Sequence, residues 1–228
     1  MAALVTTPIV SRVSGLLQDA GNVRWTLPEL LSYITDAARE VCIYKPEACA
    51  KTATVTLVAG TKQSLPADGS VLLDVVRNMG VGGATPGRVP RLVSRDLLDA
   101  QNPNWHASTP AAEAKHYTFD PQSQKVFYVY PPQPATPGSL EMVYAAAPVE
   151  LTDGGTLPMD DTWLPAIVNY VLYRCYAKDA EHAGNSALAV TYYQAFNAML
   201  AGKTGSESLS DPARNSRSMN PLNRNAQG

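Results

Sequence analysis

The spacing of apolar residues changes twice along the chain, and this change restricts the fold more than any other feature of the sequence. Up to residue 50 and again after Asp161, apolar residues recur every three or four positions, as they do in amphipathic helices. From residue 51 to 150 they alternate with polar residues or form short runs, as they do in β-strands. Helical segments at both ends of a β-rich stretch predict an α+β protein.

The N-terminal helical region contains two predicted helices. The first begins at residues 7–8, where a proline suits the first turn, and is expected to end at Gly21. The second begins at Thr26, because Thr26 and Glu29 have the T-x-x-E spacing of a capping box. Its apolar face continues to Pro46, where the helix is expected to end.

The middle region carries strand and turn signals. Three segments favour strands: TATVTLVAG, SVLLDVVRNMG and SLEMVYAAAP. The segment HYTFDPQSQKVFYVYPP predicts a hairpin, because turn residues separate two runs rich in aromatic residues. The segment SRDLLDAQN predicts a short helix with Ser94 as its N-cap. These signals together predict a small antiparallel β-region.

The C-terminal helical region is predicted to hold two further helices. We expect Asp161 to cap the first, which reaches Gly184, and Asn185 to cap the second, which ends at Gly202. The pair resembles a tetratricopeptide unit, but such repeats bury their faces by stacking at least three times. An ordinary helical hairpin is therefore the favoured interpretation.

These signals predict three parts of the chain. Residues 1–50 and 151–202 are expected to form a helical bundle, because each helix is too amphipathic to be stable alone. Residues 51–150 are expected to form the β-rich insertion. Residues 203–228 are expected to form an extended C-terminal arm, disordered in the free subunit, since they contain no aromatic residue and few apolar ones.

The composition argues against several classes of protein. Charged residues make up 17 % of the chain and the net charge is −2, whereas dedicated nucleic-acid-binding proteins normally have a strong basic excess. We recognise no secretory signal and no run of about 18 apolar residues that would span a membrane. Cys42, Cys49 and Cys175 form no C-x-x-C pair and are odd in number, so we expect reduced, mostly buried thiols in a cytosolic protein.

The sequence gives no sign of catalytic, cofactor-binding or metal-binding residues. GGATPGRV, residues 82–89, resembles a phosphate-binding loop, but Arg88 replaces the lysine and Val89 has no hydroxyl for a metal. Pro90 also makes a helix start there unfavourable. The histidines lack ligand spacing, and no G-x-S-x-G serine motif occurs. We therefore predict no nucleotide site and no enzyme activity.

Two arginine-containing segments are the candidate partner-binding sites. Four arginines and no acid lie between Arg77 and Arg95, and the glycines among them would let this loop mould itself to a partner. The loop is either a solvated surface or a contact for a phosphate backbone or an acidic neighbour. In the C-terminal arm, arginines surround a small apolar anchor. The predicted partner-binding residues are Arg88, Arg91, Arg214, Arg217, Met219, Leu222 and Arg224.

Four segments in this order resemble the head-to-tail adaptor, or connector, proteins of tailed bacteriophages. They are RWTLPELLSYITDAAREV, LVAGTKQSLPADGSVLLDVVRNMG, FYVYPP and VLYRCYAKDAEHAGNSALAVTYYQAF, and the resemblance spans residues 8–202. The C-terminal arm corresponds only by position and composition.

The resemblance implies a structural virion protein without catalytic residues. Such adaptors form rings, usually of twelve copies, beneath the portal and extend its DNA channel to the tail. The implied partners are the portal protein, a tail or nozzle protein, other copies of the chain, and genomic DNA that passes without sequence-specific binding. The implied location is the head-tail junction, after synthesis in the host cytoplasm. The loop at residues 82–89 would then meet a neighbouring ring or tail component.

Two alternatives come from other classes of protein. A monomeric protein-interaction module could use the C-terminal helix pair as a scaffold. A virion-associated hydrolase would need polar residues gathered in a pocket, such as His116 beside an acid.

Overall fold

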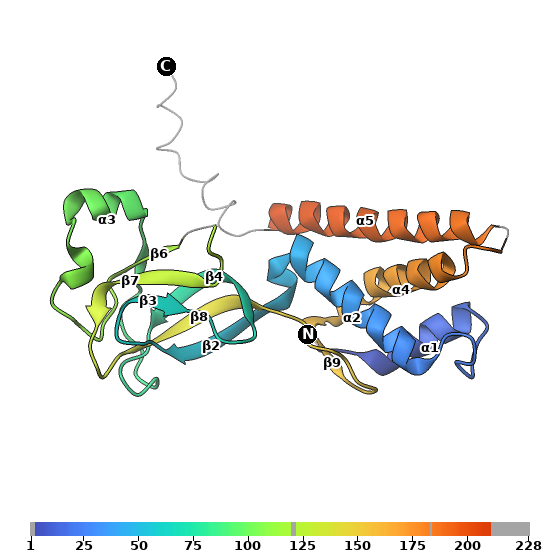
Figure 1. Ribbon diagram of the computed structural model, residues 1–228, viewed down its shortest axis with the longest axis horizontal. Helices are drawn as coiled ribbons and strands as arrows, with labels where there is room; N and C mark the ends of the chain where they lie inside the picture. Colours follow the sequence, from blue (N-terminus) through green and yellow to red (C-terminus); the bar gives the residue numbers. More distant parts are fainter. Residues whose placement is uncertain (1–2, 120–121, 183, 211–228) are drawn as a thin grey trace, which may run out of the picture. The chain divides into compact units, whose positions relative to one another are not determined.

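The computed structural model describes residues 3–119, 122–182 and 184–210, with only the backbone described from residue 203 onward. The described chain divides into two compact units, which are drawn in Figure 1. We call residues 3–6 and 38–161 the strand unit, and residues 7–37 and 162–210 the helical unit. The α+β class predicted from the sequence is confirmed.

The strand unit contains three sheets. The first has the order β2-β8-β4, the second β3-β7-β6-β5, and the third pairs β1 with β9. All pairs are antiparallel except β5 with β6, which is parallel. The strands are β1 (Ala3–Val5), β2 (Ala50–Thr56), β3 (Gly60–Ser64), β4 (Gly69–Asn78), β5 (Arg91–Leu92), β6 (His116–Phe119), β7 (Val126–Gln133), β8 (Ser139–Ala146) and β9 (Thr156–Asp160).

The two larger sheets share one apolar core. Along β7 and β8 alternate residues point into it, as the period of two in the sequence predicts, whereas the pairing register of β4 shifts and its core residues lie three apart. Each large side chain buried in this way contributes about 1.5–3 kcal/mol to folding. The core includes Leu72 and Val75 from β4, Tyr117 from β6, Phe127 and Val129 from β7, and Leu140, Met142 and Tyr144 from β8.

Two helices begin at the capping residues that the sequence predicts. The backbone N–H of Thr26 donates to the Glu29 carboxylate at the start of α2, which is one half of the predicted capping box. Ser94 caps α3 by accepting from the N–H of Leu97. The helices are α1 (Thr6–Leu16), α2 (Leu27–Tyr44), α3 (Arg95–Gln101), α4 (Leu164–Lys178) and α5 (Asn185–Ser210), with 3₁₀ turns η1 (Pro46–Cys49), η2 (Trp105–Ala107) and η3 (Asp161–Trp163).

Aromatic rings join α4 to α5 in the helical unit. Tyr176 stacks on Tyr192 with ring centroids 5.6 Å apart, and Tyr170 meets Phe196 edge-on at 5.1 Å. Phe196 is fully buried. Such ring pairs add about 0.5–1.5 kcal/mol to the free energy of simple burial. They hold α5 against the second half of α4, from Tyr170 to Tyr176.

Four predicted helix boundaries are wrong. The helix expected to reach Gly184 ends at Lys178. The first helix ends at Leu16 and not at Gly21, because residues 17–25 form a loop in which Asp19 accepts three backbone N–H groups. Asp161 is not an N-cap but begins the 3₁₀ turn η3. The last helix continues past Gly202 to Ser210, so the first eight residues of the predicted arm are helical. One glycine costs a helix only about 1 kcal/mol relative to alanine, which is too little to end a helix by itself.

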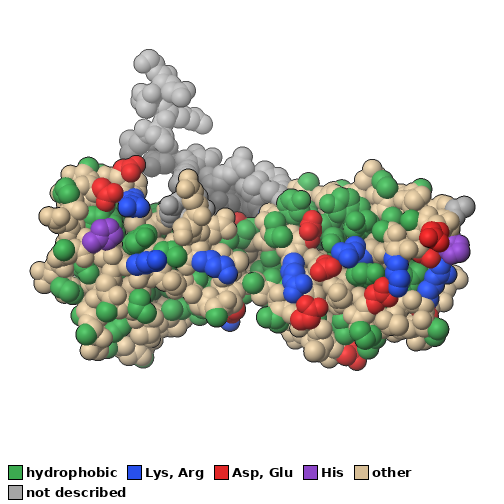
Figure 2. Space-filling view, viewed as in Figure 1, with side chains coloured by type: hydrophobic (Ala, Val, Ile, Leu, Met, Phe, Trp, Pro, Cys, Tyr) green, Lys and Arg blue, Asp and Glu red, His purple; other side chains and the backbone are tan. Residues whose placement is uncertain are grey.

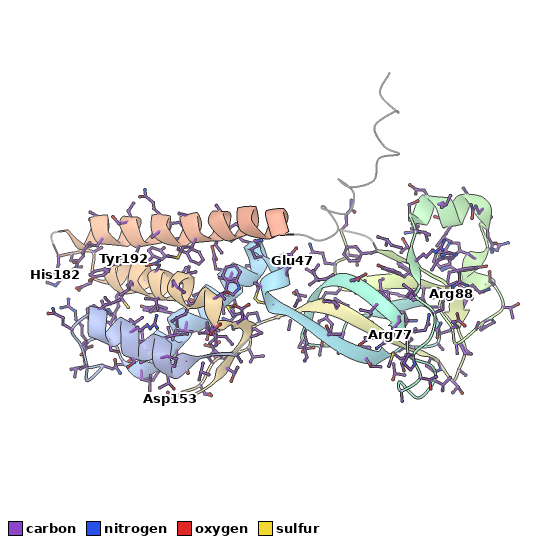
Figure 3. All side chains as sticks on the ribbon, turned by 180° about the vertical axis from the view of Figure 1, so that it is seen from behind. Glu47, Arg77, Arg88, Asp153, His182 and Tyr192 are labelled. Atoms are coloured by element: carbon purple, nitrogen blue, oxygen red, sulfur yellow. A yellow bond between two sulfur atoms is a disulfide. The ribbon has the colours of Figure 1, made fainter. Side chains whose placement is uncertain are left out.

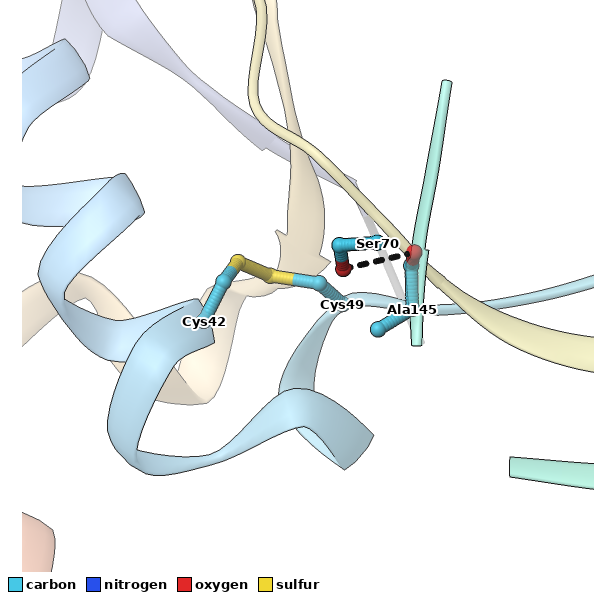
Figure 4. The surroundings of a disulfide bond; sticks show 4 residues. All are labelled: Cys42, Cys49, Ser70 and Ala145. Carbon is cyan, nitrogen blue, oxygen red and sulfur yellow. Dashed lines mark hydrogen bonds between the residues drawn. A yellow bond between two sulfur atoms is a disulfide. The ribbon is translucent and has the colours of Figure 1, made fainter. Parts of the chain in front are cut away.

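The prediction of three reduced cysteines is also wrong. Cys42, in the last turn of α2, forms a disulfide with Cys49 at the end of η1, with their Cα atoms 5.8 Å apart (Figure 4). The turn that begins at Pro46 reverses the chain and returns Cys49 to the helix end, which a search for C-x-x-C spacing misses. Only Cys175 is free among the described residues. Burial, with a smaller effect from Glu29, raises the pKa of its thiol to about 12.

Across the described ranges, every helix is too short or too polar to cross a lipid bilayer.

Candidate interaction surfaces

Residues 79–88 form a closed loop between β4 and β5. The backbone N–H of Asn78 donates to the Arg88 carbonyl at 3.0 Å, and the N–H of Gly87 donates to the Asn78 carbonyl at 2.8 Å. The buried side-chain amide of Asn78 donates to the carbonyls of Arg88 (2.7 Å) and Ala114 (2.8 Å). These bonds fix the backbone, so the loop differs from the mouldable segment expected from its glycines.

Two glycines of this loop have backbone angles that favour glycine. Gly80 and Gly83 have φ values of 66° and 71°. A Cβ atom at Gly83 would lie 3.3 Å from the Thr54 side chain and 3.5 Å from Ser139 Oγ. The loop leads into β5 and not into a helix, whose N-terminus holds the phosphate in nucleotide-binding loops.

The four arginines around this loop fall into two kinds. Arg77 pairs with Glu141 of β8 at 2.5 Å, and Arg95 pairs at 3.4 Å with the carboxylate four residues later in α3. Arg88 and Arg91 are exposed and form no salt bridge within the described residues. The two arginines without a salt bridge in the described chain are thus the two of the four that the sequence predicts to bind a partner.

His116 lies beside these two arginines. Arg91 is the register partner of His116 across β5 and β6, and the His116 ring stacks on Tyr130 with centroids 6.1 Å apart. Its Nδ1 atom is buried and has no hydrogen-bond partner among the described residues. Burial lowers the pKa of His116, and the positive charges of Arg88, Arg91 and Lys115 lower it further. The ring is therefore neutral at pH 7, and the three cations form a basic surface around it.

In the helical unit, several charged side chains form ion pairs between helices. Figure 2 shows basic and acidic side chains interleaved over the helices, whereas some basic side chains over the strands have no acidic neighbour in that view. In the helical unit, ion pairs connect α4 and the residue after it to α2 and the preceding loop. These pairs are Arg24 with Asp179, Arg174 with Asp36 at 3.0 Å, and Lys178 with Glu29 at 2.6 Å.

A pocket of about 440 Å³ lies in the strand unit beside β1, β9 and η1. Ala3, Ala48, Leu157 and Met159 contribute apolar atoms to its walls, and Glu47 and Asp160 contribute carboxylates. Glu47 is exposed and has no ion pair among the described residues. No pattern in the sequence indicates this pocket, because its walls come from segments about 100 residues apart.

The remaining candidate residues lie outside the described part of the chain. They are Arg214, Arg217, Met219, Leu222 and Arg224. Within the described ranges, no group of three or more histidine, cysteine, aspartate or glutamate side chains could hold a metal ion.

Comparison with known proteins gives one match. The model of a family described as SU10 adaptor protein matches residues 7–224, which include most of the strand unit and the described helical unit. A search of curated proteins found no match.

Proposed function

The chain belongs to the SU10 adaptor protein family, a family of phage head-to-tail adaptors, and we propose that it forms a ring beneath the portal and joins the portal to the tail. The observation that carries this proposal is the family match, which covers residues 7–224 of 228. The chain is thus a structural phage protein, and the virion is its location. We place it at the head-tail junction, where its ring continues the channel through which DNA passes.

The unpaired charges of the strand unit support a role in assembly. Interfaces between proteins are enriched in arginine, and an arginine without an internal partner can form its bonds with a neighbour. Arg88 and Arg91 meet this condition within the described residues. A weakly charged surface around a DNA channel would let the phosphate backbone slide, whereas a strongly basic surface would hold it. We infer that these arginines contact protein and that DNA passes without sequence-specific binding.

We propose that the C-terminal segment binds the portal. Met219 and Leu222 flank Pro221, and Arg214, Arg217 and Arg224 surround this apolar pair. The arginines outnumber the acids of the segment and suit carboxylates in a portal groove. A segment that folds as it binds can cover a large surface, which suits a joint under DNA pressure. In this proposal the helices within 1–50 and 151–202 act as one bundle that supports the β-rich insertion 51–150, and the arm 203–228 begins as the last turns of α5.

The test of this proposal combines imaging with binding to portal rings. Negative-stain images of the purified protein should show rings, and the protein should co-sediment with portal. Deleting residues 211–228 should leave the unfolding midpoint nearly unchanged and reduce co-sedimentation sharply. Replacing Arg12, an exposed arginine of α1, with alanine is the matched control and should leave portal binding intact. If the protein stays monomeric at high concentration and does not co-sediment with portal, the result would favour the alternative of a monomeric interaction module.

The hydrolase alternative gains no support from the surroundings of His116. The charged groups that lower its pKa are Arg88, Arg91 and Lys115, all of them bases. A general acid or base of a hydrolase needs a carboxylate or a second histidine to position it. His116 instead contributes its ring to a stack with Tyr130.

A further inference from the structure

The strand unit carries ionised side chains that have no salt bridge among the described residues, and they are unevenly distributed. The free bases lie on or beside the four-stranded sheet β3-β7-β6-β5: Lys62, Arg88, Arg91, Lys115 and Lys125. Several free acids lie near the end of α2 and beside β9: Glu40, Glu47, Asp153 and Asp161. Asp96 in α3, Glu113 before β6 and Asp74 of β4, which accepts a hydrogen bond from the Tyr117 hydroxyl, are free acids nearer to the bases. The unit is therefore charged with opposite signs in two places.

The backbone beneath the basic surface is fixed by hydrogen bonds, so its side chains can bind a partner without ordering the backbone first. We define the basic edge as Arg88, Val89, Arg91, Leu92 and Lys115, along the edge strand β5. Hydrogen bonds from Asn78 to the Arg88 carbonyl and from the Arg91 N–H to the Lys115 carbonyl fix its backbone. Val89, between the two arginines in the sequence, is 59 % exposed, and Leu92, directly after Arg91, is 64 % exposed. Arginine beside exposed apolar side chains on a fixed backbone is typical of an interface, because little conformational entropy is lost on binding.

The pocket beside β1, β9 and η1 has the complementary chemistry. Its apolar walls suit the valine and leucine of the basic edge, and the exposed carboxylate of Glu47 suits an arginine. Lys51 also lines the pocket, but its ammonium group is bonded to Asp68 at 2.7 Å. It therefore leaves Glu47 free to take a charge from outside. We call this pocket the acidic pocket.

We propose that the basic edge of one copy docks into the acidic pocket of the next copy around the ring. This inference rests on the ring of the proposed function. Figure 3 shows Glu47 and Arg88 at different ends of the strand unit, so the two surfaces are separate patches of one subunit. A contact between two different patches is heterologous, and repeated head to tail it closes a ring when the rotation between copies allows. Each copy then offers one donor and one acceptor surface.

The first test reverses the charge of the basic edge. The R88E/R91E variant should retain its melting temperature but assemble about 100-fold more weakly than the unmodified chain, because like charges would then face each other. K62E is the matched control, since Lys62 is an exposed, unpaired base in β3 at the other edge of the same sheet. It should assemble as the unmodified chain does. Mass photometry over a concentration series measures both.

The second test restores the contact with the opposite reversal. The E47R variant alone should also fail to assemble, because its pocket would repel the arginines. A 1:1 mixture of E47R with R88E/R91E brings an acidic edge to a basic pocket at every second contact. The mixture should therefore recover assembly in part, with equal amounts of the two chains. If a reversal lowers the melting temperature, R88Q/R91Q and E47Q replace it, with an expected weakening of about 10-fold.

The outcomes separate this inference from the proposed function. If the unmodified chain forms no ring, the proposed function fails and this contact fails with it. If R88E/R91E forms rings as well as the unmodified chain, the ring stands and the basic edge is not its contact. An equal loss in K62E would point to net charge and contradict the inference. Failure of the mixture to recover would contradict the acidic pocket as the receiving surface.

Discussion

Both units of this protein contain internal ion pairs, but the strand unit also carries a group of exposed arginines without an internal partner among the described residues. In the helical unit, Arg174 and Lys178 of α4 bond to carboxylates of α2, and these pairs hold helices together. In the strand unit, Arg88 and Arg91 bond to no carboxylate of the described chain, although their backbone is fixed by Asn78. The strand unit also pairs some charges internally, such as Arg77 with Glu141 and Lys51 with Asp68, but it keeps a group of exposed cations without an internal partner in the described ranges. The comparison teaches that paired charge contributes to the fold in both units, whereas the unpaired arginines of the strand unit remain available to partners.

The largest expected effect comes from the aromatic contact of the helical unit. Replacing Phe196 with alanine removes a fully buried ring that packs against Tyr170, and should destabilise this unit by about 3–5 kcal/mol. The matched change in the strand unit is Phe127→Ala, which removes a ring that is 1 % exposed. Urea unfolding followed by circular dichroism should show two transitions, of which each variant shifts one. A common shift of both transitions would mean that the units unfold together and would break the comparison.

The next effect concerns the disulfide between Cys42 and Cys49. The C42A/C49A variant lacks this cross-link, which closes a loop with a sequence separation of seven in the unfolded chain. By the chain-entropy relation, its loss should lower the free energy of unfolding by about 2.5 kcal/mol. Reductant should have the same effect on the unmodified chain and none on the variant. Cys175, buried in the helical unit with a raised thiol pKa, should stay unreactive toward thiol reagents until the protein unfolds. Equal unfolding curves with and without reductant would contradict this expectation.

A smaller effect follows from Glu29 in the helical unit. Burial alone would raise the pKa of Glu29, but hydrogen bonds from Lys178 and Tyr33 outweigh it and lower the pKa below 4.5. Because the pKa is lower in the folded state, the stabilisation is complete above about pH 4.5 and is lost as the pH falls through the folded value. The partly exposed pair should contribute about 0.5–1 kcal/mol. Unfolding curves from pH 7 to 3 should therefore converge for the unmodified chain and E29Q.

E150Q is the control for this pH dependence. Glu150 pairs with Arg39 at 3.0 Å, but its side chain is 68 % exposed, so solvent screens the pair. Its removal should change stability little at any pH. A pH dependence as large as that of E29Q would show that exposed pairs in the strand unit also support the fold.

Local signals in the sequence predicted the elements that depend on neighbours in the chain. The capping residues at Thr26 and Ser94 and the turn between β6 and β7 each act within a few residues, and the structure contains the elements they predict. The disulfide, the length of α5 and the short strands β1, β3, β5 and β9 were not predicted. Strands this short show too little alternation of apolar and polar residues to be recognised, and they form because a neighbouring strand pairs with them.

The candidate surface was predicted only in part for the same reason. The excess of arginine over acid between Arg77 and Arg95 was visible in the sequence. Which of these arginines are free depends on carboxylates elsewhere, such as Glu141, which lies 64 residues from Arg77. The role of Asn78 depends on Ala114, which lies 36 residues away. Residues this far apart in the sequence cannot be paired from a local motif or from helix or strand periodicity.

The smallest expected effect on stability, and the sharpest test of the comparison, comes from Arg88 and Arg91. The R88A/R91A variant should change the free energy of unfolding by no more than about 0.5 kcal/mol, because both side chains are exposed and the loop is held by Asn78 and backbone bonds. Arg77→Ala is the comparison, since it breaks the pair with Glu141 and should cost about 1 kcal/mol. Thermal unfolding measures both variants, and co-sedimentation measures assembly. If R88A/R91A melts far below Arg77→Ala, Arg88 and Arg91 support the fold, and they are then not held in reserve for a partner.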